Sequence, residues 1–275
     1  RRGRGVKRGA AFGGVGMIIV AIIALLLGKN PFQAIDMVNS VVPGQTSEEV
    51  VDPSRMNENE DLKVFTLGVF NSANDVWTEI FRTQMGESYR NPVLVNFTDQ
   101  TTSACGGATA QVGPFYCPGD EKVYIDLNFF HQLTRDYGAR GDMAMAYVTA
   151  HEVGHHVQKL LGIVDQVNQY RGRISEAEYN KIMVKMELQA DFFAGLWANQ
   201  ASKLGIIQLE PGDLESAISA TTAVGDDTLQ KEAMGYTVPD SFTHGTAAQR
   251  TYWFRKGYQT GDIRQGDTFN DPSLR

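Results

Sequence analysis

Cysteine is scarce in this chain, which has two cysteines, Cys105 and Cys117, among 275 residues. Their surroundings, "ACGG" and "CPGD", lack the spacing that cysteine ligands of zinc show, which excludes a metal site built from cysteines. A disulfide between the two would close a short loop. Such bonds form outside the reducing cytosol, so this prediction depends on the location of the chain.

Positive charge is scarce once the N-terminus is set aside. Five of the first eight residues are basic: Arg1, Arg2, Arg4, Lys7 and Arg8. Removing these five from the 25 basic residues leaves 20 against 32 acidic ones, a balance of −12. An acidic domain is a poor binder of phosphate backbones, so we expect no nucleic-acid partner.

Long apolar runs are limited to one, residues 10–28, which carries no charge. Its length is just enough to span a bilayer as a helix. The basic residues 1–9 before it place the N-terminus in the cytoplasm and the rest of the chain outside it. We therefore predict a single-pass anchor in the lipid bilayer, with a cleaved signal peptide as the alternative. A disulfide between Cys105 and Cys117 is then expected, with two buried free thiols as the alternative.

The rest of the chain predicts one linker and one domain. Residues 29–60 are polar, acidic and interrupted by proline, which is typical of a linker. Residues 61–275 read as one α+β domain, mainly helical with a small β-sheet. Apolar spacing predicts a helix from residue 61 to 87, with a break near Asn71, and two short strands, "NPVLVNFTD" and "EKVYIDLNF".

Three of the five histidines lie within six residues, in "AHEVGHHVQ". Apolar spacing predicts a helix from Asp142, as its cap, to Gly162. His151 and His155 are four apart and share one face of that helix, where both can bind one zinc ion. Glu152 completes an HExxH motif, in which the glutamate is the general base for a zinc-activated water.

A third zinc ligand is expected further along the chain. Ser175 and Glu178 form a capping box that predicts the start of a second long helix. On it Glu187 can complete the zinc site, and Asp191, one turn later, can accept the outer N–H of one ligating imidazole. The alternatives are a solvated charge for Glu187 and a helix-surface acid for Asp191. His156 points away from the histidine pair and is expected at the surface or in a supporting role.

Four blocks of sequence carry a resemblance to a known family. The blocks "GPFYCPGDEKVYIDLNFF", "HEVGHHVQ", "ELQADFFAG" and "FTHGTAAQR" resemble the bacterial neutral zinc metallopeptidases, which are of the gluzincin type. The resemblance implies a zincin-like peptidase domain anchored in the bacterial cell membrane, with its catalytic domain on the non-cytoplasmic side. It also implies one catalytic Zn²⁺ and a protein or peptide substrate. Phe192 stands where that family has cysteine, at a position that is not a ligand.

The last block, "THGTAAQR", is similar to the C-terminal block of membrane gluzincins. A neutral imidazole of His244 would hydrogen-bond the oxyanion of a tetrahedral intermediate. The alternatives are that His244 caps the following helix or contacts Asp226 or Asp227. For Arg250 we expect a structural ion pair rather than a contact with substrate.

These features predict a membrane-anchored zinc metallopeptidase, with Glu152 as general base. We expect residues 121–127 to be an edge strand near the metal, where an extended peptide pairs with it. The alternative is a membrane-tethered zinc-binding scaffold without turnover. A zinc hydrolase of non-peptide substrates is a third reading.

Overall fold

The computed structural model describes most of the chain from residue 53 onward: residues 53–98, 100–109, 113–135, 138–139 and 141–274. The predicted basic N-terminus, the predicted membrane segment and most of the predicted linker lie outside these residues. Within them, no helix combines the length and the apolar character needed to cross a bilayer.

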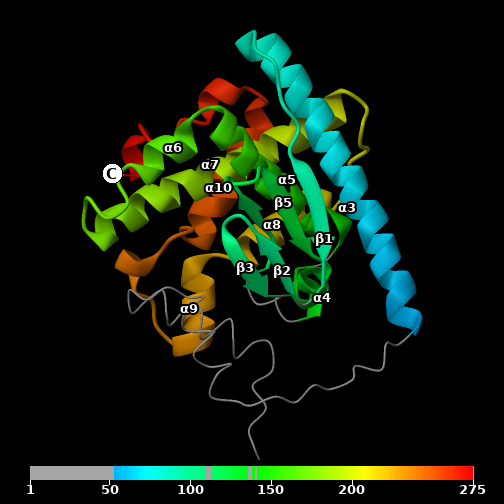
Figure 1. The fold of residues 1–275 in the computed structure, drawn as a ribbon, viewed down its shortest axis with the longest axis horizontal. Helices are drawn as coiled ribbons and strands as arrows, with labels where there is room; N and C mark the ends of the chain where they lie inside the picture. Colours follow the sequence, from blue (N-terminus) through cyan, green and yellow to red (C-terminus); the bar gives the residue numbers. More distant parts are fainter. Residues whose placement is uncertain (1–52, 99, 110–112, 136–137, 140, 275) are drawn as a thin grey trace, which may run out of the picture. The chain divides into compact units, whose positions relative to one another are not determined.

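Helices dominate the described residues, and five short strands lie between the first helix and the rest (Figure 1). The predicted α+β class, mainly helical with a small sheet, is confirmed. The elements are, in chain order, α3 (Pro53–Ile80) with a π-helical turn (Phe81–Met85), β1 (Val93–Phe97), β2 (Gln100–Ser103), β3 (Gly106–Thr109), β4 (Phe115–Cys117), β5 (Lys122–Asp126), α4 (Leu127–Arg135), α5 (Asp142–Leu160), α6 (Ile163–Asn168), α7 (Glu176–Lys203), α8 (Asp213–Ala223), α9 (Asp226–Met234) and α10 (Ala247–Thr260), with short 3₁₀ turns at Pro239–Ser241, Ile263–Gln265 and Pro272–Leu274.

The main sheet has the strand order β1-β5-β4, and β2 pairs with β3 in a separate hairpin. β1 runs parallel to β5, with Val93 opposite Lys122, and β4 runs antiparallel to it, with Phe115 opposite Tyr124. The prediction that residues 121–127 form an edge strand is therefore wrong, because β5 is central. Its residues 123–126 are all buried, which is typical of a strand covered on both faces rather than of an edge.

The helix α7 lies at the centre of the domain, because every residue from Glu187 to Ala198 is buried. α5 and α10 both pack against it. α10 comes unusually close: a Cβ on its Gly257 would lie 2.0 Å from the carbonyl oxygen of Phe192 in α7. A Cβ on Gly195 of α7 would lie equally close, 2.0 Å, to the carbonyl oxygen of Phe254 in α10. Two glycines facing each other thus set the spacing of these helices.

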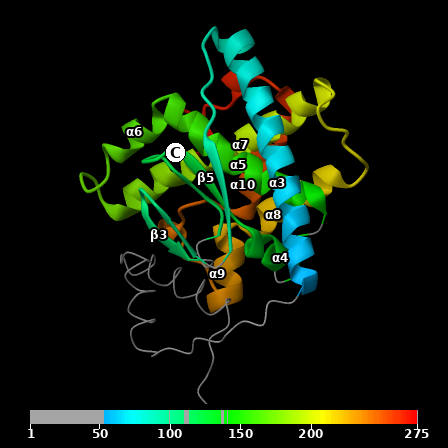
Figure 2. The same cartoon turned by 45° about the vertical axis from the view of Figure 1, so that its right-hand side comes forward.

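The first long helix, α3, lies along one side of this helical core (Figure 2). The predicted break near Asn71 is wrong, since the helix continues to Ile80. Two polar residues near Asn71 are buried partners of other elements: Trp197 donates to Ser72 Oγ at 2.8 Å, and Tyr89 donates to Asn74 Oδ1 at 3.0 Å. The helix also begins at Pro53, inside the segment predicted as linker.

Candidate metal centre

The helix α5 carries the HExxH motif, and its N-terminus is held by another helix. Asp142 was predicted as the cap, but it is the first helical residue and the cap position is Gly141, without a side-chain hydrogen bond. Ser216 of α8 supplies the missing acceptor, because its Oγ lies 3.0 Å from the backbone N of Ala144. The helix ends at Leu160 rather than at the predicted glycine. The predicted capping box of Ser175 at the start of α7 is confirmed.

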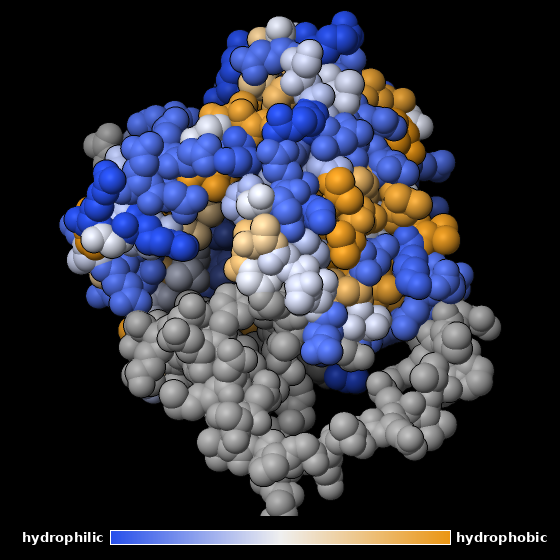
Figure 3. All heavy atoms as spheres, viewed as in Figure 1, coloured by the Kyte–Doolittle hydropathy of each residue, from blue (hydrophilic) through white to orange (hydrophobic). Residues whose placement is uncertain are grey.

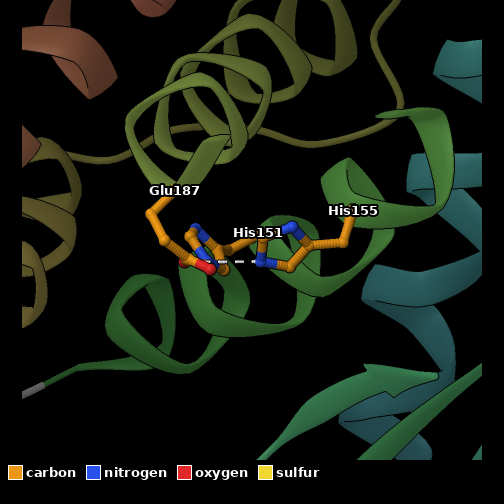
Figure 4. A group of neighbouring side chains, drawn as sticks. All are labelled: His151, His155 and Glu187. Carbon is orange, nitrogen blue, oxygen red and sulfur yellow. Dashed lines mark hydrogen bonds and ion pairs between the residues drawn. The ribbon is translucent and has the colours of Figure 1, made fainter. Parts of the chain in front are cut away.

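Two helices bring His151, His155 and Glu187 together, as Figure 4 shows. Oε2 of Glu187 lies 3.1 Å from Nε2 of His151 and 3.4 Å from Nε2 of His155. Four ligands at about 2.0–2.2 Å around a tetrahedral zinc ion are separated by about 3.3–3.6 Å. The two distances to Glu187 are close to this separation, and all three donor atoms lie within 4.8 Å of one another. The chemical nature of these donors fits zinc, with a fourth position left for water or substrate.

The glycine inside the motif allows α5 and α7 to approach. A Cβ on Gly154 would lie 3.3 Å from the carbonyl oxygen of Ala190 and 3.3 Å from Cβ of Phe193. A larger residue there would meet the backbone of α7. The short distance between the helices lets Glu187 reach the two imidazoles of the facing helix.

The outer nitrogen of His151 faces a buried ionic network. Its Nδ1 lies 2.9 Å from Oδ1 of Asp191, although off the direction of a well-formed hydrogen bond. The fully buried Asp191 also accepts from Tyr147 Oη and from Arg250, whose Nε is 2.9 Å from Oδ2. Arg250 further donates to the carbonyl oxygen of Val224 at 3.0 Å. Arg250 thus lies in an ion pair with Asp191, and Asp191 is not a helix-surface acid.

The outer nitrogen of His155 has a partner that the sequence analysis missed. Its Nδ1 lies 2.9 Å from Oε1 of Gln158, three residues further along α5. Gln158 is fully buried and also contacts Met186 and Gln189 of α7. The helical spacing of i and i+3 could have indicated this pair, but the contacts across to α7 depend on the tertiary structure.

The electrostatic field at the site is strongly negative. Desolvation acts to lower the pKa of His151, but Asp191 and Glu187 outweigh it and raise that pKa to about 10. Desolvation acts to raise the pKa of Glu187, yet the two histidines hold it well below its ordinary value. A field that favours a proton on an imidazole also favours a divalent cation in the same place. For Glu152, burial is the largest influence and raises the pKa of the carboxyl group.

The loop between α9 and α10 brings His244 to the same region. Thr246, not His244, caps α10. His244 Nδ1 lies 3.3 Å from Oδ1 of Asp226, whose other oxygen accepts the backbone N–H of His244 at 2.7 Å. The next residue, Gly245, lies against Leu188 beside Glu187 in the chain. The charge on His244 helps to lower the pKa of Glu187, which places the ring within electrostatic range of the site.

Asp227, the residue after Asp226, also has a structural partner. Its Oδ1 accepts the backbone N–H of Ala247 at the first turn of α10, at 2.7 Å. Together with Asp226, it fixes the loop that carries His244.

His156 is fully buried rather than at the surface, which was one of the two places predicted for it, and its contacts lie away from the metal ligands. Its Nε2 lies 2.6 Å from the carbonyl oxygen of Arg90, and its Nδ1 lies 3.0 Å from Tyr116 Oη. Because the carbonyl oxygen is only an acceptor, Nε2 carries the proton and Nδ1 accepts from the tyrosine. Burial, the largest influence, lowers the pKa of His156. This histidine connects α5 to the sheet.

The predicted disulfide is confirmed. Cys105 and Cys117 are joined, with their Cα atoms 5.8 Å apart. The bond connects the turn between β2 and β3 to the end of β4.

Comparison with known families agrees with this geometry. The model of the family described as "Putative neutral zinc metallopeptidase" matches residues 1–269. The chain belongs to this family. Among curated relatives, "Uncharacterized protein YpfJ" of Escherichia coli (strain K12) is 43% identical over 267 residues, which cover 97% of this chain and 90% of the relative. "Uncharacterized protein Rv2575" of Mycobacterium tuberculosis (strain H37Rv) is 39% identical over 265 residues, which cover 91% and 86%. No solved structure gives a significant match.

Proposed function

We propose that this member of the neutral zinc metallopeptidase family hydrolyses peptide bonds with a single catalytic zinc ion held by His151, His155 and Glu187. The observation that carries the proposal is the convergence of two imidazole nitrogens and one carboxylate oxygen within 4.8 Å of one another. The family provides independent support.

Zinc in this position would polarise the scissile carbonyl and make a bound water more acidic. Glu152 follows His151 directly and takes a proton from the attacking water as its oxygen bonds to the carbonyl carbon. The same proton then passes to the leaving amine as the C–N bond breaks. Burial raises the pKa of Glu152, which favours a group that both accepts and returns a proton.

His244 is the group that we propose to stabilise the oxyanion. Its Nδ1 lies 3.3 Å from the carboxylate of Asp226, which can only accept a hydrogen bond, and 3.0 Å from Oγ1 of Thr243, which can accept or donate one. Desolvation acts to lower the pKa of His244, but Asp226 outweighs it and raises that pKa. This favours the doubly protonated ring in place of the neutral imidazole expected from sequence. A charged imidazole donates from Nε2 to a developing negative oxygen.

An extended peptide would pair with β4 rather than with β5. Among the described strands β4 has a single neighbour, β5, and it lies against α5, which carries the motif. The disulfide fixes the end of this strand. Main-chain hydrogen bonds to such an edge would hold the scissile bond in an extended conformation.

A digest of a mixed peptide library tests the proposal. The protein is expected to cleave peptides, to lose this activity with a chelator and to regain it with zinc. Glu152→Gln is expected to keep zinc and lose turnover by several orders of magnitude, whereas Glu176→Gln, at an exposed glutamate of α7, keeps both. Zinc bound without any cleavage would instead favour the zinc-binding scaffold, and unchanged cleavage by Glu152→Gln would remove that residue from the mechanism.

We also propose that residues 10–28 anchor the protein in the bacterial membrane, with the domain on the non-cytoplasmic side. The support is the uncharged run after a basic N-terminus, together with a disulfide, which forms in oxidising compartments. The protein is expected to stay in the membrane fraction at alkaline pH. Protease added to spheroplasts is expected to degrade the domain, and full protection of the domain would contradict this orientation.

A further inference from the structure

The two histidines of the site differ in what holds them. His151 faces the carboxylate of Asp191, which is a familiar outer partner of a zinc ligand. His155 faces an uncharged amide, that of Gln158, and no carboxylate contact to its Nδ1 is found among the described residues. Gln158 has no exposed surface, so it fills no role at the outside of the protein.

The orientation of the Gln158 amide is fixed by its other contacts. Its Nε2 lies 2.7 Å from the carbonyl oxygen of Met186, which can only accept a hydrogen bond. Turning the amide by 180° would place two oxygens at that distance. The nitrogen must therefore face Met186, and the oxygen must face His155.

A second glutamine reinforces this direction. Nε2 of Gln158 also lies 3.1 Å from Oε1 of Gln189. The amide of Gln189 is oriented in turn by Gly266, whose carbonyl oxygen lies 2.8 Å from Nε2 of Gln189. Two backbone carbonyl groups, one in α7 and one in the C-terminal segment, thus set the direction of the whole chain of hydrogen bonds.

The consequence for His155 is a single tautomer. An oxygen that only accepts faces Nδ1, so Nδ1 carries the proton and Nε2 keeps its lone pair. Nε2 is the nitrogen that lies 3.4 Å from Glu187. The same amide also joins α5 to the turn of α7 between Met186 and Gln189, which carries Glu187.

We propose that Gln158 is a positioning residue of the metal site: it holds His155 in the tautomer that ligates through Nε2 and fixes His155 relative to Glu187. This inference rests on the proposed zinc function. In this proposal the outer partner of His155 is a neutral side chain, whereas the outer partner of His151 is a carboxylate. Removing such a partner typically weakens metal binding about 10- to 100-fold.

Cobalt(II) substitution of the full chain provides a direct readout. Each histidine ligand that holds a proton on its outer nitrogen gives one strongly shifted, exchangeable proton signal in the NMR spectrum. We expect two slowly exchanging signals, from His151 and His155. In Gln158→Met, which keeps the volume but removes the acceptor, one signal is lost to rapid exchange, the other stays, and zinc affinity falls about 10- to 100-fold.

Two variants separate positioning from a general loss of packing. Gln158→Glu keeps an acceptor toward His155 but loses the donor toward the carbonyl group of Met186, so it is expected to retain both signals and to restore only part of the affinity. Gln230→Met removes another buried, hydrogen-bonded glutamine, whose partners are Ser241 and Val238, and is expected to leave both signals and the affinity unchanged.

Two slowly exchanging signals and wild-type zinc affinity in Gln158→Met would overturn this inference while leaving the zinc site intact. Failure of the wild-type protein to bind either cobalt or zinc would overturn the proposed function itself, and this inference with it. If Gln158→Met does not fold, Gln158→Leu replaces it in the comparison. That variant also removes the acceptor that faces His155, so loss of one signal with weakened zinc binding supports the inference, and two signals with wild-type binding overturn it.

Discussion

Replacing Arg250 by methionine tests the buried ionic network behind the metal site. The side chain of Arg250 is 4% exposed and that of Asp191 is 0% exposed, so neither charge is solvated by water. Methionine fills much of the space but leaves the Asp191 carboxylate without its cation and the carbonyl group of Val224 without its side-chain donor. Breaking a buried pair in this way costs about 3–5 kcal/mol, a large part of a typical free energy of unfolding of about 5–15 kcal/mol.

Urea denaturation followed by circular dichroism measures this cost. With an m-value of about 3 kcal/mol/M, the midpoint of urea denaturation is expected to fall by about 1–2 M. The matched control is Arg264→Met, which removes a similar two-bond pair with Asp262 from an arginine that is 82% exposed. Its midpoint is expected to stay within experimental error, because exposed pairs contribute little.

The double variant Arg250→Met with Asp191→Asn completes the test. The double variant removes both charges, so its loss of free energy of unfolding is expected to be smaller than the sum of the losses in the two single variants. Equal midpoint shifts for Arg250→Met and Arg264→Met would refute the reasoning. Strict additivity in the double variant would show that the unpaired carboxylate is not the cause of the loss.

Three further predictions concern packing, the disulfide and pH. Gly257→Ala is expected to lose at least about 1–3 kcal/mol of stability, because its Cβ meets the backbone of α7, whereas Gly68→Ala, at an exposed position of α3 with open space around it, gains about 0.5–1 kcal/mol; thermal denaturation distinguishes the two, and equal shifts would contradict the close approach. Reduction of the single disulfide, which spans 12 residues, is expected to lower the free energy of unfolding by about 3 kcal/mol in urea, and no change would contradict its role. Since Asp226 raises the pKa of His244, the stability that this ion pair adds is full below the ordinary pKa of histidine and is lost as the pH rises through the raised one. The difference in stability between chelated wild type and Asp226→Asn is therefore expected to shrink from pH 5 to 9, down to the part that comes from the backbone N–H bonds to Asp226, and a difference that does not change with pH would contradict the coupling.

The surface adds a feature that no sequence pattern indicated. On the face in Figure 3, apolar side chains gather over the side where α3 and β1 lie, among mainly polar ones. Val64, Leu67 and Val93 are among the exposed large apolar residues, with 71%, 48% and 55% of their surface exposed. Val64 and Leu67 lie on α3, whose apolar residues occur on both faces of the helix, and Val93 begins β1.

Local geometry is what the sequence by itself determined. The spacing of His151 and His155 places both on one face of any α-helix, and Ser175 with Glu178 caps a helix through contacts three residues apart. Two of the five strands, β1 and β5, were recognisable from their β-branched and aromatic residues. These predictions succeeded because each depends on interactions within a few residues of chain.

Long-range packing decided the rest. Whether β5 is central or at an edge depends on β1 and β4, and whether polar residues break α3 depends on partners such as Trp197 far along the chain. The role of Gln158 depends on two backbone carbonyl groups, those of Met186 and Gly266, that have no sequence signature of their own. Hydrogen-bond direction in a buried network is set by every partner at once, so only the tertiary structure could determine it.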